Sequence, residues 1–483
     1  MQPKGRTRAI RLVAMTALFA STAAFTLAGC SSAGSGTTTI TLSGPNQFNA
    51  DTNSFGPAWD KLVSGFEKDN PDIIVKTNVL PIASWAQASA AQLTAGTAPE
   101  LIFNQTTHTP SQVQSLDSYL NKPNPFIAGN KKWIDALNPK YFGGPGKLGL
   151  NAAGNHERVP FNLVGVAIYY NKSILAKTKI DVSSLSTFAG FVKSCETLKK
   201  AGYAPLATDN GPLTHGWEMI AISSTIFNEE VKKLNQFDPT GAPGTANPLA
   251  GKSIAKAVLT GELDVSTNPQ VTSALKLLKA FNDACATPNW SGVKASGAFS
   301  GGTDFQAGKA AMAWGTNFAA SNLTSKDFKY GTLAFPTVSK SDSKYASGEA
   351  AQFGVSTGGT SYMIPSYIKG KQLSAAVKFL QYVSSPKIQP WLDKTASIPA
   401  VTGLKAPPGL SAFTDGRWST VPVQGQGAAL IELPAALSAQ NPYEGYVLGE
   451  TPLETALATF QKNNLTWARE QVTQGKWTEA WAK

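Results

Sequence analysis

Few residues of this chain combine types and spacings that could carry out catalysis. GVSTG (354–358) fits the Gly-x-Ser-x-Gly pattern, in which a serine nucleophile sits on a sharp turn between strand and helix. In that enzyme class the histidine follows the serine, whereas all three histidines of this chain precede Ser356. His156-Glu157 begins like the zinc motif His-Glu-x-x-His, but position 160 is proline. The patterns therefore predict a protein that is not an enzyme.

Motifs that would predict a cofactor or a metal are missing as well. The sequence has neither a Cys-x-x-Cys pair nor the Gly-x-x-x-x-Gly-Lys-Ser/Thr loop that holds nucleotide phosphates. With three cysteines and three histidines, neither a metal site with several ligands nor any cofactor is expected. Any two of the 31 acidic residues could still converge as a glycosidase pair. A secreted carbohydrate-active enzyme therefore remains the alternative from a different functional class.

Uncharged polar and aromatic side chains offer another chemistry, the binding of a sugar. A sugar presents apolar C–H faces and a rim of hydroxyls, so its site needs flat rings and a few fixed hydrogen-bonding groups. The chain has 11 tryptophans and only 15% charged residues. Candidates in loops between expected elements are Asn46, Gln47, Asn104, Gln105, Trp217, Gly359 and Thr360. No arginine flanks these loops, which favours a neutral ligand over a phosphate ester.

The elements that must position these side chains alternate between strands and helices. TITLSG (39–44) and DIIVKTNVL (72–80) have the composition of strands. Between them, apolar residues at positions i, i+3, i+4 and i+7 predict a helix over 59–66, which Asn70-Pro71 ends. This alternation continues along the chain and predicts an α/β fold.

The way in which the net charge of +11 is distributed along the chain argues against a nucleic-acid partner. Four of these charges lie in residues 1–29, which contain no acid, and the remaining 38 basic and 31 acidic residues leave +7. That excess is spread along the chain, whereas a nucleic-acid footprint is normally clustered.

The N-terminus predicts export. An uncharged stretch over 12–27 follows Arg11 and has the length of a signal-peptide core. Leu27-Ala28-Gly29-Cys30 then resembles the lipobox of bacterial lipoproteins, which implies cleavage before Cys30 and diacylglycerol on its thiol. Residues 30–37 would be a flexible tether. We expect anchoring to the outer face of the cytoplasmic membrane, at the cell surface or in a periplasm. The alternative is an ordinary secretory signal with a chance cysteine.

Cys195 and Cys285 are the two other cysteines. In an oxidising compartment they are expected to form a disulfide. Two unpaired buried thiols are the alternative, because the sequence does not show whether the Cα atoms come within bridging distance.

Several segments in a fixed order resemble the extracellular solute-binding proteins of ABC transporters, specifically the sugar-binding family that includes maltose-binding protein. The order runs over nearly the whole chain after the lipobox. The segments that carry it best are LTAGTAPELIF (93–103), VPFNLVGVAIYYNKSIL (159–175), FQAGKAAMAWGTNF (305–318), GTSYMIPS (359–366) and AAVKFLQYVSSP (375–386).

The resemblance implies two lobes, each an open mixed sheet flanked by helices, with a ligand cleft between them. Lobe 1 would comprise 38–159 and 337–410, and lobe 2 would comprise 160–336 and 411–483. Phe318 falls where the family places a stacking aromatic, usually tryptophan, and Asn317 beside it would hydrogen-bond hydroxyls. Plain packing of Phe318 is the alternative.

By this resemblance the chain would be the substrate-binding component of an ABC importer. It would capture a mono- or oligosaccharide by hinge closure and deliver it to the transmembrane permease, acting as a monomer. Within the family, a sugar phosphate or a polyol is the alternative ligand.

Overall fold

The computed structural model describes residues 36–46, 53–81, 84–144, 148–246, 249–293, 299–323, 328–353, 355–356, 359–414 and 441–483. All elements below belong to the compact unit formed by residues 37–483. The predicted signal peptide, Cys30 and Gln47 lie outside the described residues. Among the described helices, none is both long enough and apolar enough to cross a membrane.

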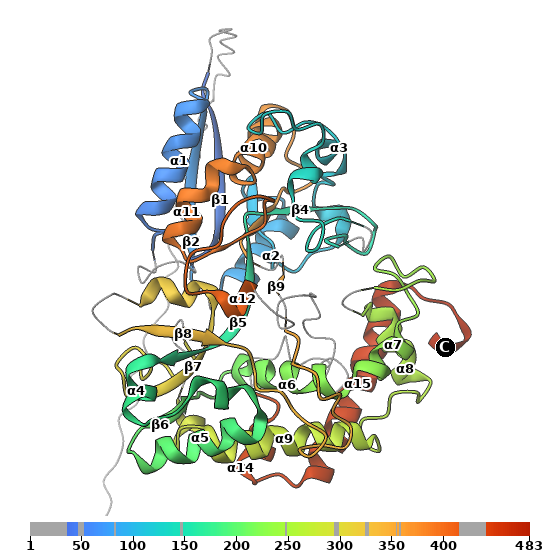
Figure 1. Ribbon diagram of the computed structural model, residues 1–483. Coiled ribbons are helices and arrows are strands. Elements are labelled where there is room, and N and C mark those ends of the chain that lie inside the picture. The colour runs from blue at the N-terminus through green and yellow to red at the C-terminus, as the bar shows by residue number, and fades with distance from the viewer. Residues whose placement is uncertain are drawn as a thin grey trace, which may run out of the picture. The chain divides into compact units, whose positions relative to one another are not determined.

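The first sheet has five strands in the order β2-β1-β3-β10-β4 (Figure 1). The strands are β1 (Thr38–Pro45), β2 (Ile73–Leu80), β3 (Leu101–Phe103), β4 (Arg158–Pro160) and β10 (Ser361–Met363). β1 runs parallel to both β2 and β3, whereas β10 is antiparallel to β3 and β4. The sheet is therefore mixed.

Helices α1 and α10 pack against the strands of this sheet. α1 (Pro57–Asp69) buries Trp59, Leu62, Val63 and Phe66 on one face, which confirms the predicted helix, and Asn70 follows its end. The other helices of this region are α2 (Trp85–Ala95), α3 (Asp117–Leu120), α10 (Gly370–Val383) and α11 (Gln389–Lys394).

The second sheet has β5 at its centre. Its main order is β11-β5-β7-β6, and β8 and β9 also pair with β5. The strands are β5 (Asn162–Asn171), β6 (Ala204–Ala207), β7 (Ala310–Thr316), β8 (Tyr330–Leu333), β9 (Val355–Ser356) and β11 (Ile398–Pro399). β6 and β7 are parallel, whereas β5 and β7 are antiparallel.

Most of the remaining helices pack against the second sheet or against helices that lie on it (Figure 1). They are α4 (Lys172–Lys177), α5 (Phe188–Lys200), α6 (Pro212–Ile226), α7 (Asn228–Leu234), α8 (Gly251–Leu259), α9 (Pro269–Cys285), α12 (Ser411–Thr414), α14 (Glu444–Leu448) and α15 (Leu453–Gly475). Two mixed sheets flanked by helices confirm the predicted α/β class.

Each sheet has its own apolar core. Trp59, Phe66 and Phe379 pack around the first sheet, and Phe191 and Phe281 pack around the second. The lobe boundaries given above stay a prediction. Val338 and Phe353 belong to the core of the second sheet, which favours a crossing after residue 353 rather than at 336.

A disulfide joins Cys195 within α5 to Cys285, the last residue of α9. The two Cα atoms are 5.1 Å apart, within the usual bridging range, and both residues are fully buried. The bond closes a loop of 90 residues and ties two helices of the second sheet together.

Candidate ligand-binding site

Topology gathers several predicted residues at one edge of the first sheet. The parallel strands β1 and β3 end at the same edge, where Asn46 and Asn104 follow them. Because β10 is antiparallel to β3, its first residues also lie there, and the Asn104 amide donates to the Ser361 carbonyl at 3.1 Å. Ligands of open α/β sheets bind outside the carboxyl ends of strands. The edge is therefore a candidate ligand site.

Three buried side chains at this edge have polar atoms without a hydrogen-bond partner among the described residues. They are Asn104 Oδ1, Thr360 Oγ1 and Ser361 Oγ. Asn104 is 7% exposed, Thr360 1% and Ser361 fully buried. A buried polar atom without a partner typically costs about 1–3 kcal/mol, so such groups need a physical explanation. Neutral acceptors and donors of this kind match the hydroxyls of a sugar.

Gly359 and Thr360 make a close contact that was predicted for a ligand but is made with Asn162. The Thr360 amide donates to Asn162 Oδ1 at 2.6 Å. A Cβ added to Gly359 would lie 2.6 Å from the same oxygen and 2.9 Å from the Asn162 carbonyl. The glycine is therefore required by this internal approach, and its role at a ligand stays a prediction.

Asn104 and Gln105 occupy the corner of a turn. The turn is closed by a hydrogen bond from the Thr106 amide to the Phe103 carbonyl at 3.2 Å. Gln105 is exposed and Asn46 is half-buried, so both differ from the buried Asn104. The structure thus brings Asn46, Asn104, Gln105 and Thr360 to one edge of the first sheet.

Asn317 and Phe318 are placed differently from the expectation. Asn317 is fully buried, its Oδ1 accepts from the Gly165 amide and its Nδ2 donates to the Ala396 carbonyl, both at 3.0 Å. It joins three segments of the chain, and its predicted contact with sugar hydroxyls stays a prediction. Phe318 is 4% exposed in the core around the first sheet, which favours the packing alternative. Its stacking role stays a prediction.

Trp217 lies in α6, half-buried, with its ring centroid 6.4 Å from that of Trp314. The next residue, Glu218, points into the core. Its carboxyl oxygens accept from Trp314 Nε1 at 3.3 Å and Asn282 Nδ2 at 2.7 Å. Burial raises the pKa of Glu218 to about 8. A half-buried aromatic ring that packs against the core of the second sheet is thus followed in the chain by a buried acid.

His215 extends this group of buried polar residues. Its Nε2 lies 3.0 Å from Asn282 Oδ1, and its Nδ1 contacts Asn441 Nδ2. An amide Nδ2 only donates, so His215 Nδ1 accepts and Nε2 carries the proton. Burial lowers the pKa of His215 to about 4. The sequence analysis missed this network, although His215 and Glu218 stand three residues apart, the spacing of neighbours on a helix.

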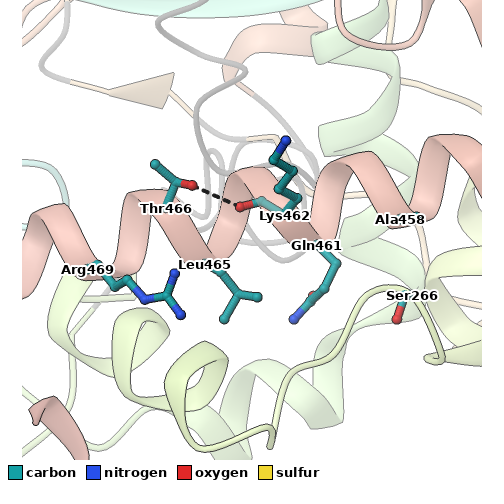
Figure 2. A pocket seen from close by; sticks show the side chains of 7 residues that line it. All are labelled: Ser266, Ala458, Gln461, Lys462, Leu465, Thr466 and Arg469. Atoms are coloured by element: carbon teal, nitrogen blue, oxygen red, sulfur yellow. Dashed lines mark hydrogen bonds between the residues drawn. The ribbon is translucent and has the colours of Figure 1, made fainter.

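Two surface cavities lie apart from these residues. One, of about 430 Å³, is formed by one face of α15 and by Ser266; Lys462, Leu465 and Arg469 are among its lining side chains (Figure 2). The second, of about 420 Å³, has the acidic residues Glu230, Glu262 and Asp264 among polar and apolar lining residues. Across the described residues, no three His, Cys, Asp or Glu side chains gather as metal ligands.

Solved structures that share this two-sheet α/β fold include sugar-binding proteins. A chitin oligosaccharide binding protein matches with a TM-score of 0.60 and 18% identity, over 89% of this chain and 99% of its own. A solute-binding protein in complex with raffinose matches with a TM-score of 0.55 and 16% identity, over 89% and 100%. The cyclic α-maltosyl-1,6-maltose binding protein of Arthrobacter globiformis matches with a TM-score of 0.55 and 14% identity, over 90% and 100%.

A match between the sequence and a protein-family model shows the family of this chain. Residues 49–390 match the model of the bacterial extracellular solute-binding proteins, and the chain belongs to that family. This confirms the resemblance and the periplasmic-binding-protein fold, and it implies an exported protein. The comparison with curated proteins finds no significant match.

Proposed function

We propose that the protein captures a neutral mono- or oligosaccharide. The observation that carries this proposal is the set of buried polar atoms without partners at the first sheet's edge, Asn104 Oδ1, Thr360 Oγ1 and Ser361 Oγ. None belongs to a charged side chain, so the set suits hydroxyls better than a phosphate ester, which recruits arginine or a helix N-terminus. The solved proteins with this fold support the same ligand class.

The aromatic half of the proposed site is less defined. Trp217 is half-buried, so part of its ring is available for a C–H face, whereas Phe318 is 4% exposed. We place Trp217 first as the stacking ring and keep Phe318 as the second candidate, which would need the cleft to open. Hinge closure of the two lobes over the sugar would complete the contacts.

Delivery to an ABC permease is the proposed role of the closed form, and the lipid on Cys30 is the proposed anchor. A chain held at the membrane meets the permease at a high effective concentration. The test of the anchor is fractionation of cells that express the full-length protein or its Cys30→Ser variant. We expect the protein in the membrane fraction and the variant outside it; an unchanged distribution would contradict lipidation.

The test of the ligand class is a thermal-shift screen of the full-length protein against raffinose, galactose, a chitin oligosaccharide, a sugar phosphate and a polyol. A ligand at 100 times its Kd adds about 2.7 kcal/mol to the stability, which raises the melting midpoint visibly. We expect a shift with a neutral sugar that is recovered intact. A shift only with the phosphate ester or the polyol would identify the alternative ligand, and a cleaved sugar would identify an enzyme.

A further inference from the structure

A histidine next to the candidate site holds the Asn104 turn in place. His108 Nδ1 lies 2.7 Å from the Thr106 carbonyl, and its Nε2 lies 3.1 Å from Glu157 Oε1. Thr106 closes the turn that contains Asn104, and its hydroxyl donates to the Phe103 carbonyl at 2.9 Å. Glu157 directly precedes β4. The imidazole thus connects the turn after β3 to the start of another strand of the same sheet.

Both partners of His108 can only accept a hydrogen bond. A backbone carbonyl has no proton to donate, and Glu157 is an ionised acceptor whose other oxygen already accepts from Asn151 Nδ2 at 2.7 Å. A neutral imidazole carries one N–H, so it can satisfy one of the two partners but not both. The geometry therefore requires the imidazolium form, with a proton on each ring nitrogen.

The charges around His108 support this protonation state. The Glu157 carboxylate, to which it is hydrogen-bonded, raises the pKa of His108 above its usual value of 6.5, against an opposing effect of burial. The Thr106 carbonyl also raises it, and Arg158, 3.6 Å from Glu157 Oε1, lowers it. Burial opposes ionisation of Glu157, but hydrogen bonds from His108 and Asn151 bring its pKa below the usual range.

We propose that His108 is a positioning residue for the candidate site: its imidazolium clasps the Asn104 turn to Glu157, so sugar binding weakens when His108 loses its proton. The inference rests on the proposed function and concerns the regulation of the same site. When one of the two bonds is lost, the turn is free to leave the conformation in which Asn104 faces the ligand. Binding then has to restore that conformation, which lowers the affinity.

The direction in which pH changes sugar binding follows from the raised pKa of His108. The clasp is present at pH values well below the raised pKa of His108, and it is lost as the pH rises through that pKa. Loss of one charge-assisted hydrogen bond corresponds to about a tenfold change in an equilibrium constant. We therefore expect the Kd for the sugar that binds in the screen to rise up to about tenfold from pH 5.5 to pH 8.5.

Two measurements on the full-length protein test this together. Isothermal titration from pH 5.5 to 8.5 gives the Kd, and NMR of the imidazole carbons gives the protonation of each histidine. The chain has only three histidines, so His108→Gln and His156→Gln spectra are enough to assign all three resonances. We expect the affinity midpoint to coincide with the titration of His108. His215, whose Nδ1 accepts from Asn441, should stay neutral over this range.

Variants separate the clasp from a merely structural role. In Glu157→Gln the acceptor oxygen remains but the charge is gone, so both the His108 titration and the affinity midpoint should move to lower pH. His108→Gln should bind the sugar more weakly and without this pH dependence. His156, which pairs with Asp117 at 2.7 Å, is the matched control, and His156→Gln should keep the pH profile.

The outcomes are distinct. Coincident midpoints that move together in Glu157→Gln support the clasp. A Kd that stays constant while His108 titrates, or a profile that His156→Gln abolishes, overturns the clasp and leaves the proposed function intact. Absence of binding by any sugar at every pH overturns the proposed function, and the clasp with it as a control of binding.

Discussion

Two groups of buried polar side chains, one at the edge of the first sheet and one beside the second sheet, differ in their hydrogen bonding. At the edge of the first sheet, Asn104, Thr360 and Ser361 leave polar atoms without partners among the described residues. Beside the second sheet, His215, Asn282 and Glu218 connect to one another through hydrogen bonds of 2.7 to 3.0 Å. A satisfied network stabilises one conformation, whereas unsatisfied atoms cost stability until a ligand meets them. The difference supports the ligand site proposed at the first edge, whereas the second network is a structural element.

The largest expected effect concerns the second region and its disulfide. Changing Cys195 and Cys285 together to alanine releases a loop of 90 residues in the unfolded chain. By the loop-entropy model this lowers the free energy of unfolding by about 4–5 kcal/mol. Urea denaturation of the oxidised protein and the double variant measures it. A difference below 1 kcal/mol would show that packing, not the cross-link, holds α5 against α9.

Breaking the network at Asn282 should have the next largest effect. Asn282→Ala leaves His215 Nε2 and the Glu218 carboxyl with fewer partners in the core, which we expect to cost about 3 kcal/mol. Denaturant midpoints measure it. Asp283→Asn on the same helix, at an exposed ion pair with Lys279, is the control and should change stability by less than about 0.5 kcal/mol. Equal losses in both variants would contradict a structural network.

The pH dependence of stability sharpens the same comparison. Glu218 keeps its proton in the folded protein up to about pH 8, while an unfolded glutamate loses it near 4.5, so stability falls as the pH rises between these values. His215, with a folded pKa of about 4 against 6.5, gives the opposite slope from pH 4 to 6.5. Between pH 6.5 and 8 the opposite contribution of His215 is absent. Over this range the Glu218 contribution should lower the free energy of unfolding by about 2 kcal/mol.

Glu218→Gln isolates this contribution. The amide keeps an acceptor for Trp314 Nε1 but does not ionise, so the variant should lose most of the decline between pH 6.5 and 8. The part due to His108 should remain, because its raised pKa also gives stability that is lost as the pH rises. Thermal melts at intervals of half a pH unit measure both. An unchanged slope in Glu218→Gln would mean that Glu218 is already ionised in the folded protein.

How much the sequence predicted depends on the range of the interaction. The spacing of Trp59 to Phe66 predicted α1, because that signal is local. The sequence did not predict that Asn104 and Thr360 share an edge, because this depends on the pairing of β3 with β10. The internal hydrogen bonds of Asn317 were not predicted, since its partners Gly165 and Ala396 are distant in sequence. The His215–Asn282 bond spans 67 residues and leaves no periodic signal. Ser361 was missed because no local sequence pattern distinguishes a serine at the start of a buried strand from other serines.

At the edge of the first sheet, we expect a substitution of Asn104 to lower the affinity for the sugar without lowering the free energy of unfolding. Asn104→Ala removes a side-chain oxygen that has no partner in the described part of the chain. We expect the Kd for the bound sugar to rise about tenfold or more, since one hydrogen bond in a dry site corresponds to about that factor. Isothermal titration measures it. Gln105→Ala, at the exposed neighbour, is the control and should change the Kd by less than a factor of about three.

The smallest expected effect is that of Ser361→Ala. For this fully buried position we predict almost no change in the free energy of unfolding, which makes the prediction specific. Ser361→Ala removes a hydroxyl that donates to no described residue and accepts from none. Deleting such a group spares the cost of its desolvation, so the free energy of unfolding should change by less than about 0.5 kcal/mol or increase. Ser384→Ala is the matched control, because the Ser384 hydroxyl accepts from Trp133 Nε1 at 2.8 Å and donates to the Leu380 carbonyl. That variant should lose about 1–2 kcal/mol. If Ser361→Ala lost as much, its hydroxyl would have a partner within the protein, and the first edge would be as satisfied as the second network.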